Sequence, residues 1–381
     1  MATLTLAGRI KAHGLAVGFD LVGISAVQDP VHGDAFAEWL RQALHGEMAY
    51  MARTAQHRLH PGQLVPWARS IVSVALNYNT PFTRDLANGQ LRGWISRYAW
   101  GDDYHHVMQA KLDRLFAFVQ AEAGADLQGR AFVDAGPVLD RESGAHAGNG
   151  WFGKNTNLLS MKIGSFFVLG ELFLSLPLPP DRPMRDRCGQ CQLCLEACPT
   201  NAFVGPYVLD ARKCISYLTI ELKGPISREL RPLMGTHIFG CDICQDVCPY
   251  NTKCRATNEA AFQPRRGLHA PELIPFLTLT EEEFRAKFHR SPILRAKRRG
   301  FLRNVCVALG NLGRVEAVPA LAHALAADPE PLVRGHAAWA LGRIGGPNAL
   351  AVLEDALERE DDATVLEEIR LAATSASRGP S

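Results

Sequence analysis

The spacing of hydrophobic and polar positions changes between two periods over the first 180 residues. It predicts two strands rich in β-branched residues, over residues 18–27 and 70–78. It also predicts two helices, over residues 34–44 and 104–123. The longest apolar run, 164–180, is interrupted by Glu171 and ends in prolines, so it is too short to cross a bilayer and predicts a buried strand. These elements mix without a regular strand–helix–strand rhythm, and we expect an α+β domain over residues 1–178.

The end of the chain repeats itself. The segment 308–313 (ALGNLG) recurs at 340–345 (ALGRIG), and the same offset places 317–321 on 349–353. Two helices per unit at this period are typical of HEAT-type repeats, which stack helix pairs. The alternative is a helical cap made of two similar hairpins. We expect residues 259–381 to form a basic linker followed by HEAT-like helices.

Length and composition are those of an ordinary multidomain protein. A chain of 381 residues exceeds what one hydrophobic core usually serves, and 47% hydrophobic and 21% charged residues exclude a disordered or fibrous class. The first residues show neither the pattern of a signal peptide nor a twin-arginine pair, so we expect a cytoplasmic protein.

Cysteines supply the strongest chemical signal. All ten except Cys306 lie within residues 188–254, and clustered thiols in a reducing compartment indicate metal binding rather than disulfides. The bacterial ferredoxin spacing Cys-x2-Cys-x2-Cys-x3-Cys-Pro is formed by Cys188, Cys191, Cys194, Cys198 and Pro199. In this motif three cysteines hold one cubane cluster and the fourth ligates the other.

A second run repeats the spacing without its first cysteine, since position 238 is Ile and the run consists of Cys241, Cys244, Cys248 and Pro249. Ferredoxin crossing assigns one [4Fe–4S] cluster to Cys188, Cys191, Cys194 and Cys248. It assigns the other to Cys198, Cys214, Cys241 and Cys244. Cys214 completes the second set from upstream, with Cys254 as the alternative. We therefore expect a ferredoxin-like domain with two clusters over residues 179–258.

Structural zinc is the competing interpretation, because zinc sites also use pairs of cysteines. Zinc sites rarely require three cysteines in this spacing followed by Cys-Pro, twice over, so iron–sulfur is favoured. Cys306 lies in a helical apolar stripe and is expected to be a small core residue.

Two clusters side by side conduct electrons, and the large N-terminal domain must hold what they reduce. No Gly-x-Gly-x-x-Gly follows a strand, and the glycine-rich segment 148–153 has a different spacing, so a Rossmann nucleotide site is unsupported. The Asp-x-His-x-x-Gly signature of cobalamin carriers with a protein histidine ligand is also absent.

Several short motifs together resemble the tRNA epoxyqueuosine reductases. They are Tyr50-Met51, His57-Arg58, Arg97-Tyr98, the segments 103–105 (DYH), 134–137 (DAGP) and 150–157 (GWFGKNTN), Arg141-Glu142 and the double ferredoxin motif. The resemblance runs from residue 1 to about 300, and the helical tail suits the longer members of that family. It implies reduction of epoxyqueuosine to queuosine at the tRNA wobble position, with cobalamin held without a protein lower ligand and reduced through two [4Fe–4S] clusters.

The resemblance also assigns roles to single residues. Asp134 matches the proton donor, a role that the loss of an epoxide oxygen requires. A carboxyl buried beside an apolar corrin face would have a raised pKa; the alternative is a turn in which Asp134 bonds its own backbone. The residues expected at cobalamin are His57, Arg97, Asp134, Leu158, Leu169, Ser216, Cys241 and Asp242. The two leucines are equally well explained as core residues, and His57 and Arg97 as a surface residue and a structural arginine.

Basic charge is concentrated at 285–303, which holds eight Lys or Arg and no acid, whereas the tail after Arg303 has eleven acids against six bases. Such a stretch beside a helical repeat suits the phosphates of tRNA, although a solvated face is the usual explanation. The predicted tRNA contacts are Lys223, Arg295, Lys297, Arg298 and Arg299.

Two other functions remain open at this point. One is a cobalamin-dependent dehalogenase acting on small organohalides, and the other is an electron carrier without chemistry of its own. For the first-ranked function we expect a monomer that takes electrons from a low-potential donor such as flavodoxin or ferredoxin and has no membrane partner.

Overall fold

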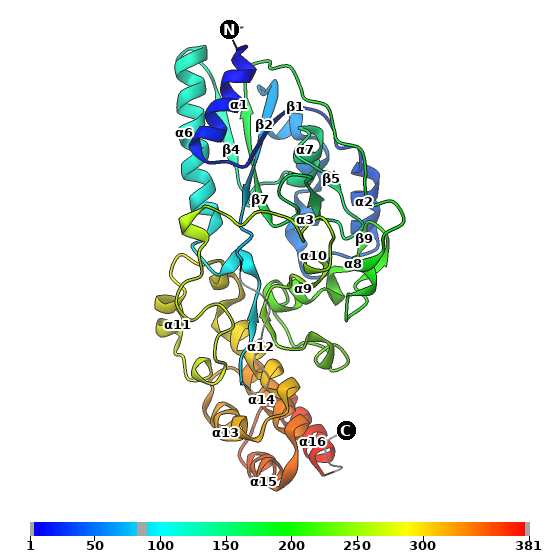
Figure 1. The fold of residues 1–381 in the computed structure, drawn as a ribbon. Coiled ribbons are helices and arrows are strands. Elements are labelled where there is room, and N and C mark those ends of the chain that lie inside the picture. Colours follow the sequence, from blue (N-terminus) through cyan, green and yellow to red (C-terminus); the bar gives the residue numbers. More distant parts are fainter. Residues whose placement is uncertain (1–3, 82–89, 378–381) are drawn as a thin grey trace. The chain divides into compact units, whose positions relative to one another are not determined.

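The computed structural model describes residues 4–81 and 90–377, and their contacts divide them into two compact units (Figure 1). Residues 4–81, 102–211 and 242–263 form the first unit, and residues 90–101, 212–241 and 264–377 form the second. The segment between the two ferredoxin motifs therefore groups with the helical tail. The three consecutive domains expected from the sequence, 1–178, 179–258 and 259–381, stay a prediction.

The first unit is built on a four-stranded antiparallel sheet in the order β1-β2-β7-β4. Its strands are β1 (Leu21–Ala26), β2 (Ser70–Asn77), β7 (Phe167–Leu174) and β4 (Gly129–Phe132). The strands predicted at 18–27, 70–78 and 164–180 are thus confirmed. All eight residues of β2 are buried, which explains its unbroken run of small and β-branched residues.

Helices cover both faces of this sheet (Figure 1). On one face lie α1 (Leu6–Val17) and α6 (Tyr104–Ala123), and on the other lies α7 (Asp140–His146). The helix α6 approaches closely at Gly170, where an added Cβ would lie 2.9 Å from the Met108 Cε atom. Leu169 faces α7, and side chains alternate along a strand, so Glu171 points to the same face as Leu169. The predicted helix at 104–123 is confirmed at both ends.

Short elements complete the first unit. Its remaining helices are α2 (Gly33–Arg41), α3 (Ala49–Arg53), α4 (Ala55–Leu59), α5 (Pro61–Leu64), α8 (Leu193–Glu196), α10 (Ile243–Asp246) and η4 (Ala260–Phe262). Two small hairpins are formed by β5 (Trp151–Phe152) with β6 (Leu158–Leu159) and by β8 (Phe203–Gly205) with β9 (Val208–Leu209). The helix predicted at 34–44 ends earlier, at Arg41, because Ala43 has a φ of +53°, which is incompatible with a right-handed helix.

The second unit opens with a two-stranded parallel sheet of β3 (Trp94–Ile95) and β10 (His237–Phe239). Its helices before the repeats are η1 (Arg97–Ala99), α9 (Ile215–Ile220), η3 (Pro232–Met234), η5 (Ile274–Phe276), α11 (Glu281–Lys287) and η6 (Pro292–Ala296), and η2 (Ala211–Lys213) lies at the boundary of the units. A capping box of Thr280 and Glu283 starts α11.

The predicted helical repeat is confirmed. It consists of α12 (Lys297–Leu312), η7 (Val315–Ala317), α13 (Val318–Ala327), α14 (Pro331–Ile344), α15 (Gly346–Leu357) and α16 (Ala363–Ala376). The helix α14 packs between α12 and α16, and α13 packs on α15.

The repeated Ala-Leu-Gly motif has a packing role. An added Cβ at Gly310 would lie 2.9 Å from the Ala340 Cα atom, and one at Gly342 would lie 2.7 Å from the Ala372 Cα atom. Gly310 therefore lets α14 approach α12 closely, and Gly342 lets α16 approach α14. The glycines that end the motif, Gly313 and Gly345, have φ values of +64° and +69° and close the helices α12 and α14.

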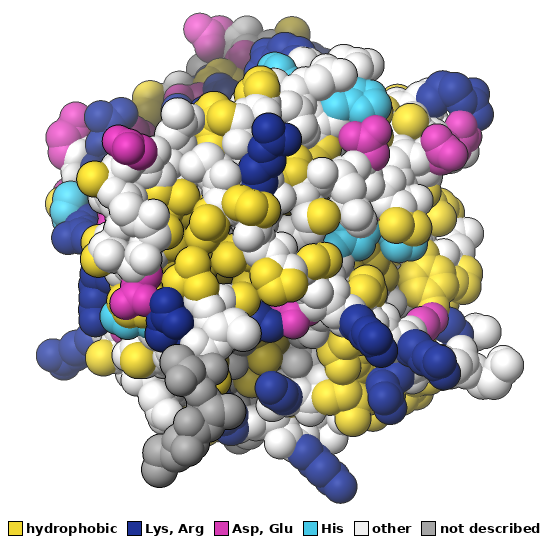
Figure 2. Space-filling model, turned by 90° about the horizontal axis from the view of Figure 1, so that it is seen from above, with side chains coloured by type: hydrophobic (Ala, Val, Ile, Leu, Met, Phe, Trp, Pro, Cys, Tyr) yellow, Lys and Arg dark blue, Asp and Glu magenta, His cyan; other side chains and the backbone are white. Residues whose placement is uncertain are grey.

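In the described part of the chain, no helix is both long and apolar enough to cross a membrane. On the face shown in Figure 2, lysine and arginine side chains lie among exposed hydrophobic ones.

Candidate functional site

The four thiols expected at the first cluster lie together in the first unit. Burial, followed by the charges of Cys248 and Cys188, raises the pKa of the Cys194 thiol to about 11, and Cys191 adds a smaller effect in the same direction. Cys248 is buried and packs with Cys188 against Trp151. Thiols that raise one another's pKa repel one another when they ionise as free groups, and a cationic iron cluster offsets that repulsion. These residues therefore fit a [4Fe–4S] cluster.

The second set is divided between the units. Cys198 and Cys244 belong to the first unit, whereas Cys214 and Cys241 belong to the second, so this set stays a prediction. Two donors approach the sulfurs of the first-unit pair: the Ala202 N–H lies 3.4 Å from the Cys198 sulfur, and the Asn157 amide lies 3.9 Å from the Cys244 sulfur. Such bonds stabilise thiolate charge, which is what a cluster ligand requires.

The side chains of Asn155 and Asn157 explain part of the 150–157 motif. The Asn155 amide donates to the Cys244 carbonyl at 3.3 Å, and its oxygen accepts from the Asn157 N–H at 3.3 Å. The loop after β5 thus braces the second ferredoxin motif from outside it. Sequence reasoning used this segment only as part of the family resemblance and missed the bracing role.

The two remaining cysteines lie outside these sets. The Cys254 thiol donates to the Tyr250 carbonyl at 2.7 Å. Cys306 is fully buried in α12, which raises its pKa well above that of a free thiol and agrees with its expected place in the core.

Asp134 lies in the loop between β4 and α7 and is exposed. Its φ of +51° places it in the left-handed region, which aspartate tolerates better than most residues. The Tyr104 hydroxyl, at the start of α6, donates a hydrogen bond to its carboxylate. A carboxyl group is thereby held at an open position with one phenol as its support.

Arg58 holds the loop that follows Asp134. It is 8% exposed, and its guanidinium donates to the Val138 carbonyl at 2.6 Å and to the Gly136 carbonyl at 3.3 Å. Its Nε atom donates to the Thr54 hydroxyl at 3.0 Å, which anchors it within α4. Burial lowers the pKa of Arg58, and the charges of Asp140 and Asp134 oppose that effect.

Two further carboxyls lie behind this loop. Burial is the main cause that raises the pKa of Asp140, at the start of α7, to about 6, and the charge of Asp134 adds to it. Burial also raises the pKa of Glu171 well above its ordinary value, and the neighbouring Asp140 adds to the shift. Three acids and one arginine thus share one region of the first unit.

Comparison with known proteins identifies the family. Residues 58–135 match the model described as epoxyqueuosine reductase QueG, residues 187–251 the 4Fe-4S double cluster binding domain, and residues 291–374 the HEAT repeats. The epoxyqueuosine reductase of Pseudomonas aeruginosa is 46% identical over 344 residues, covering 89% of this chain and 95% of the relative. The chain belongs to the epoxyqueuosine reductase family.

Other relatives agree. The Escherichia coli epoxyqueuosine reductase is 43% identical over 341 residues, covering 89% of each chain. A crystal structure of a selenomethionine-labelled epoxyqueuosine reductase matches with a TM-score of 0.89 at 33% identity, covering 97% of this chain and 98% of the other. A Bacillus subtilis epoxyqueuosine reductase, solved with its catalytic aspartate loop swung out of the active site, matches with a TM-score of 0.88 at 32% identity, covering 96% and 98%.

Membership confirms the resemblance seen in the sequence and decides between the open alternatives. The chain is an oxidoreductase whose cofactors are two [4Fe–4S] clusters and cobalamin. Membership in this family thereby favours iron–sulfur clusters over structural zinc. It also favours an enzyme over an electron carrier without chemistry of its own.

The residues expected at cobalamin are divided between the units. In the first unit His57 is exposed on α4 and Asp134 is exposed on its loop, so both offer polar groups to a ligand. Leu158 is 3% exposed and shares an apolar cluster with the half-buried Leu169, and Asp242 is fully buried before α10.

In the second unit, the Arg97 guanidinium lies 5.9 Å from the ring centres of both Trp94 and Trp100. Ser216 is half-buried in α9, and Cys241 is half-buried after β10. Their roles at cobalamin stay predictions.

The basic run at 285–303 is only partly a surface feature. Arg298 is buried and forms an ion pair with Asp328 at 2.5 Å, so its charge is used inside the second unit rather than offered to a nucleic acid. Arg303 is fully buried as well. Of the other predicted tRNA contacts, Lys223, Arg295, Lys297 and Arg299 are exposed.

Three of these cations lie within reach of one another. Burial lowers the pKa of Lys223, and the charges of Arg295, Arg303 and Lys297 lower it further, while Glu221 opposes them. Arg295 pairs with Glu221 at 2.8 Å. We call Lys223, Arg295 and Lys297 the basic patch.

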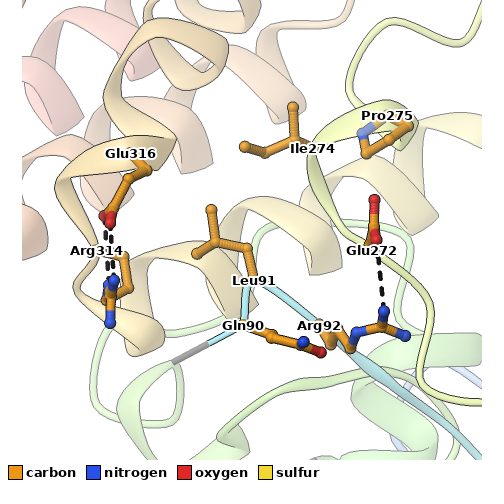
Figure 3. Close-up of a pocket in the computed structure, with 8 residues that line it drawn as sticks. All are labelled: Gln90, Leu91, Arg92, Glu272, Ile274, Pro275, Arg314 and Glu316. Carbon is orange, nitrogen blue, oxygen red and sulfur yellow. Dashed lines mark hydrogen bonds and ion pairs between the residues drawn. The ribbon is translucent and has the colours of Figure 1, made fainter. Parts of the chain in front are cut away.

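A pocket of about 330 Å³ lies in the second unit (Figure 3). Its lining comprises Gln90, Leu91, Arg92, Glu272, Ile274, Pro275, Arg314 and Glu316. The Arg92 guanidinium pairs with Glu272 at 3.4 Å and that of Arg314 with Glu316 at 2.7 Å (Figure 3). Both cations are thus partnered by acids within the pocket wall.

Proposed function

We propose that this chain reduces the epoxide of epoxyqueuosine in tRNA to queuosine, the last step of queuosine biosynthesis, with Asp134 as the proton donor. The 46% identity to an epoxyqueuosine reductase over 89% of the chain carries the reaction. A relative of TM-score 0.89 and 32% identity, solved with an epoxyqueuosine-modified tRNA-Tyr stem loop, supports tRNA as the substrate.

Asp134 suits the acid because it combines access with support. Its carboxyl is exposed, so a substrate can reach it, and the Tyr104 hydroxyl fixes its direction. General acids of this kind contribute roughly 10²–10⁴-fold to a rate. In the Bacillus subtilis relative the loop of the catalytic aspartate swings out of the active site, which supports a loop that moves during turnover.

The cofactors divide the remaining work. Bound clusters and cobalamin supply the two electrons that the reduction consumes. The cysteines of the first set would hold one cluster, and one of them, Cys191, is exposed. We propose that a low-potential carrier such as flavodoxin or ferredoxin delivers electrons there to a monomeric, cytoplasmic enzyme.

The second cluster is proposed to use Cys214 rather than Cys254, because Cys254 follows both motifs and lies outside the ferredoxin pattern. Replacing Cys214 by Ala should remove about half of the bound iron, since one of two [4Fe–4S] clusters is lost. Cys254→Ser is the matched control and should retain all of it. The opposite outcome would assign Cys254 to the cluster.

The basic patch is proposed as a contact for tRNA phosphates. Lys223, Arg295 and Lys297 are exposed and share one electrostatic field, so a phosphate placed among them would relieve their mutual repulsion. A fourth exposed cation is Arg299 of α12, whose guanidinium lies 4.0 Å from the Glu330 carboxylate. Arg298 is left out of this proposal because its guanidinium forms an ion pair with Asp328.

Steady-state turnover tests the reaction and the acid together. Protein purified without oxygen and loaded with iron and cobalamin should convert epoxyqueuosine tRNA to queuosine tRNA. Asp134→Asn should lower the rate at least about 100-fold. Asp126→Asn changes another exposed acid of the first unit and serves as the control. Full loading without conversion of this tRNA would overturn the proposed substrate, and an active Asp134→Asn variant would overturn the proposed acid.

A further inference from the structure

Glu171 is a buried acid without an ordinary partner. It lies in the middle of the sheet on β7, opposite Ser73 of β2 and Phe132 of β4, and is 0% exposed. Neither of its carboxyl oxygens accepts a hydrogen bond from an N–H or O–H group of the described residues. A buried carboxylate left in this state is strongly disfavoured, because nothing replaces the water that it loses.

The group beside Glu171 is the carboxyl of Asp140, at the first turn of α7. Two adjacent carboxyls cannot both be ionised at low cost, and they bond to each other only if one carries a proton. Glu171 is the more deeply buried of the two, and Asp140 also lies at a helix N-terminus, where negative charge is favoured. A proton held on Glu171, the more deeply buried of the two, would let its hydroxyl donate to the Asp140 carboxylate.

This pair is joined to Asp134 by a short loop of fixed shape. The loop from Asp134 to Asp140 is held at the Gly136 and Val138 carbonyls by Arg58. The charge of Asp134 acts on both Asp140 and Glu171, which places the three carboxyls in one electrostatic group. The charges of Asp134 and Arg58 act on the pair, and the Tyr104 hydroxyl donates to Asp134.

The chemistry of the reaction gives such a pair a purpose. Converting an epoxide to an alkene breaks both carbon–oxygen bonds, consumes two electrons and two protons, and releases the oxygen as water. A single carboxyl holds one proton, so Asp134 can protonate the oxygen only once before it must be recharged. A second proton has to arrive within the same turnover.

We propose that the Glu171–Asp140 pair supplies this second proton, passing it to Asp134 after Asp134 has given its own to the departing oxygen. The proposal rests on Asp134 being the donor. Glu171 releases its proton to Asp140, Asp140 hands it to Asp134, and solvent restores the pair after the water has left. Glu171 and Asp140 are positioning residues in this scheme, because they act through Asp134 and do not touch the substrate.

Infrared spectroscopy of the holoenzyme tests the stored proton directly. A protonated carboxyl has a carbonyl stretch that an ionised carboxylate lacks. The spectrum of wild type at neutral pH should contain such a band, and Glu171→Gln should lack it. Glu259→Gln is the matched control, since Glu259 is a half-buried acid of the same unit paired with Lys111 at 2.9 Å, and should retain the band. A wild-type band that Glu171→Gln leaves in place would overturn the proposal.

Kinetics separates proton supply from folding. The glutamine amide of Glu171→Gln still donates to Asp140, so the variant should fold and bind tRNA with an unchanged KM, while kcat falls about tenfold to a hundredfold. The solvent deuterium isotope effect on kcat should rise, because proton transfer becomes limiting. Glu171→Asp keeps an acid and should recover part of kcat, which a merely structural role would not allow for a shorter side chain in a packed sheet.

Asp140→Asn provides a second test should Glu171→Gln not fold. It removes the group that passes the proton on, so kcat should fall while the infrared band remains. Wild-type kcat and isotope effects in the acid-pair variants would overturn the inference and leave the role of Asp134 intact. Full activity of Asp134→Asn would instead overturn the proposed function on which the inference rests.

Discussion

Arg58 in the first unit and Arg303 in the second are both buried guanidinium groups that donate to main-chain carbonyls. Arg303 is fully buried and donates to Leu218 at 2.5 Å and to Gly224 at 2.7 Å, with Asn304 as a side-chain partner. These bonds join α12 to α9 and the loop after it. Its side chain thus acts as a structural cross-link inside the second unit.

Arg58 makes similar bonds in a different setting. The carbonyls that it holds belong to the loop between Asp134 and Asp140. Burial lowers the pKa of Arg58, and the charges of both acids raise it. Burial and hydrogen bonding therefore do not distinguish a structural arginine from one that serves a reaction. The distinguishing feature is the kind of titratable group within its field, because Arg58 faces the acids Asp134 and Asp140, whereas the charge of Arg303 acts on the bases Lys223 and His336.

The largest effect on stability is expected at Arg303. Arg303→Met leaves several buried carbonyls without a donor, and the free energy of unfolding of the second unit should fall by about 3–5 kcal/mol. Hydrogen exchange of α9 and α12 measures this loss locally. The exposed Arg359→Met is the control and should stay within about 0.5 kcal/mol of wild type. Unchanged exchange at α9 would contradict the cross-link.

Arg58→Met should destabilise the first unit less, by about 2–3 kcal/mol, because fewer carbonyls lose their donor. Its main effect should be on turnover, where a displaced Asp134 loop lowers kcat about tenfold or more at unchanged tRNA affinity. Since the charge of Arg58 lowers the pKa of Asp140, its loss should also move the pH dependence of kcat upward. A variant with normal kcat and pH dependence would place Arg58 in the same class as Arg303.

Asp140 should make the first unit less stable as pH rises. Its pKa in the folded protein is about 6, above the ordinary 3.8, so its contribution is fully present below about pH 4 and is lost as pH rises through 6. The loss is about 2–3 kcal/mol. Asp140→Asn should flatten this dependence and be the more stable protein near pH 7, as measured by urea unfolding at both ends of the window. Asp126→Asn should retain the wild-type slope, and a wild-type slope in Asp140→Asn would contradict the assignment.

Much of the fold follows from the sequence because its signals are local. The helix at 104–123 is set by apolar residues on one face and ends where the pattern ends, and Asp103 caps it by accepting the His105 N–H. The repeat at 308–313 and 340–345 marks the glycines of α12 and α14 at which neighbouring helices approach closely. The strands at 18–27 and 70–78 follow from β-branched runs of the right length.

The acid pair could not be found in this way. In the sequence Glu171 is a single polar residue that interrupts an apolar run, and its partner Asp140 comes 31 residues earlier. Only the antiparallel pairing of β4 with β7 and the packing of α7 bring the two together. A lone acid inside a strand that is otherwise buried is the signal that should have raised the question.

Charge was the other misleading guide. Eight cations without an acid suggest an exposed stripe, but a helix that packs on both sides buries some of them whatever their charge. Arg298 pairs with Asp328, 30 residues away in the chain, and Arg303 donates to the Leu218 carbonyl of α9, 85 residues away. The sequence contains no local sign of either contact.

The smallest stability effect is expected at the exposed arginine of the same run. Arg295→Ala removes a surface ion pair with Glu221 and should change the free energy of unfolding by less than about 1 kcal/mol. Together with Lys297→Ala it should weaken tRNA binding, and each lost phosphate contact should reduce the salt dependence of the affinity by about one unit of slope. Arg359→Ala is the matched control. Wild-type affinity and slope in the double variant would remove the basic patch from the tRNA interface.

Single-turnover reduction of epoxyqueuosine tRNA tests the central claim most directly, because it separates the acid from the supply of electrons. Holoenzyme reduced in advance is mixed with the tRNA, and queuosine is measured over time in wild type and Asp134→Asn. We predict that both proteins bind the tRNA and that the variant forms product at least about 100-fold more slowly. Equal rates of product formation would show that Asp134 is not the acid and would contradict the account.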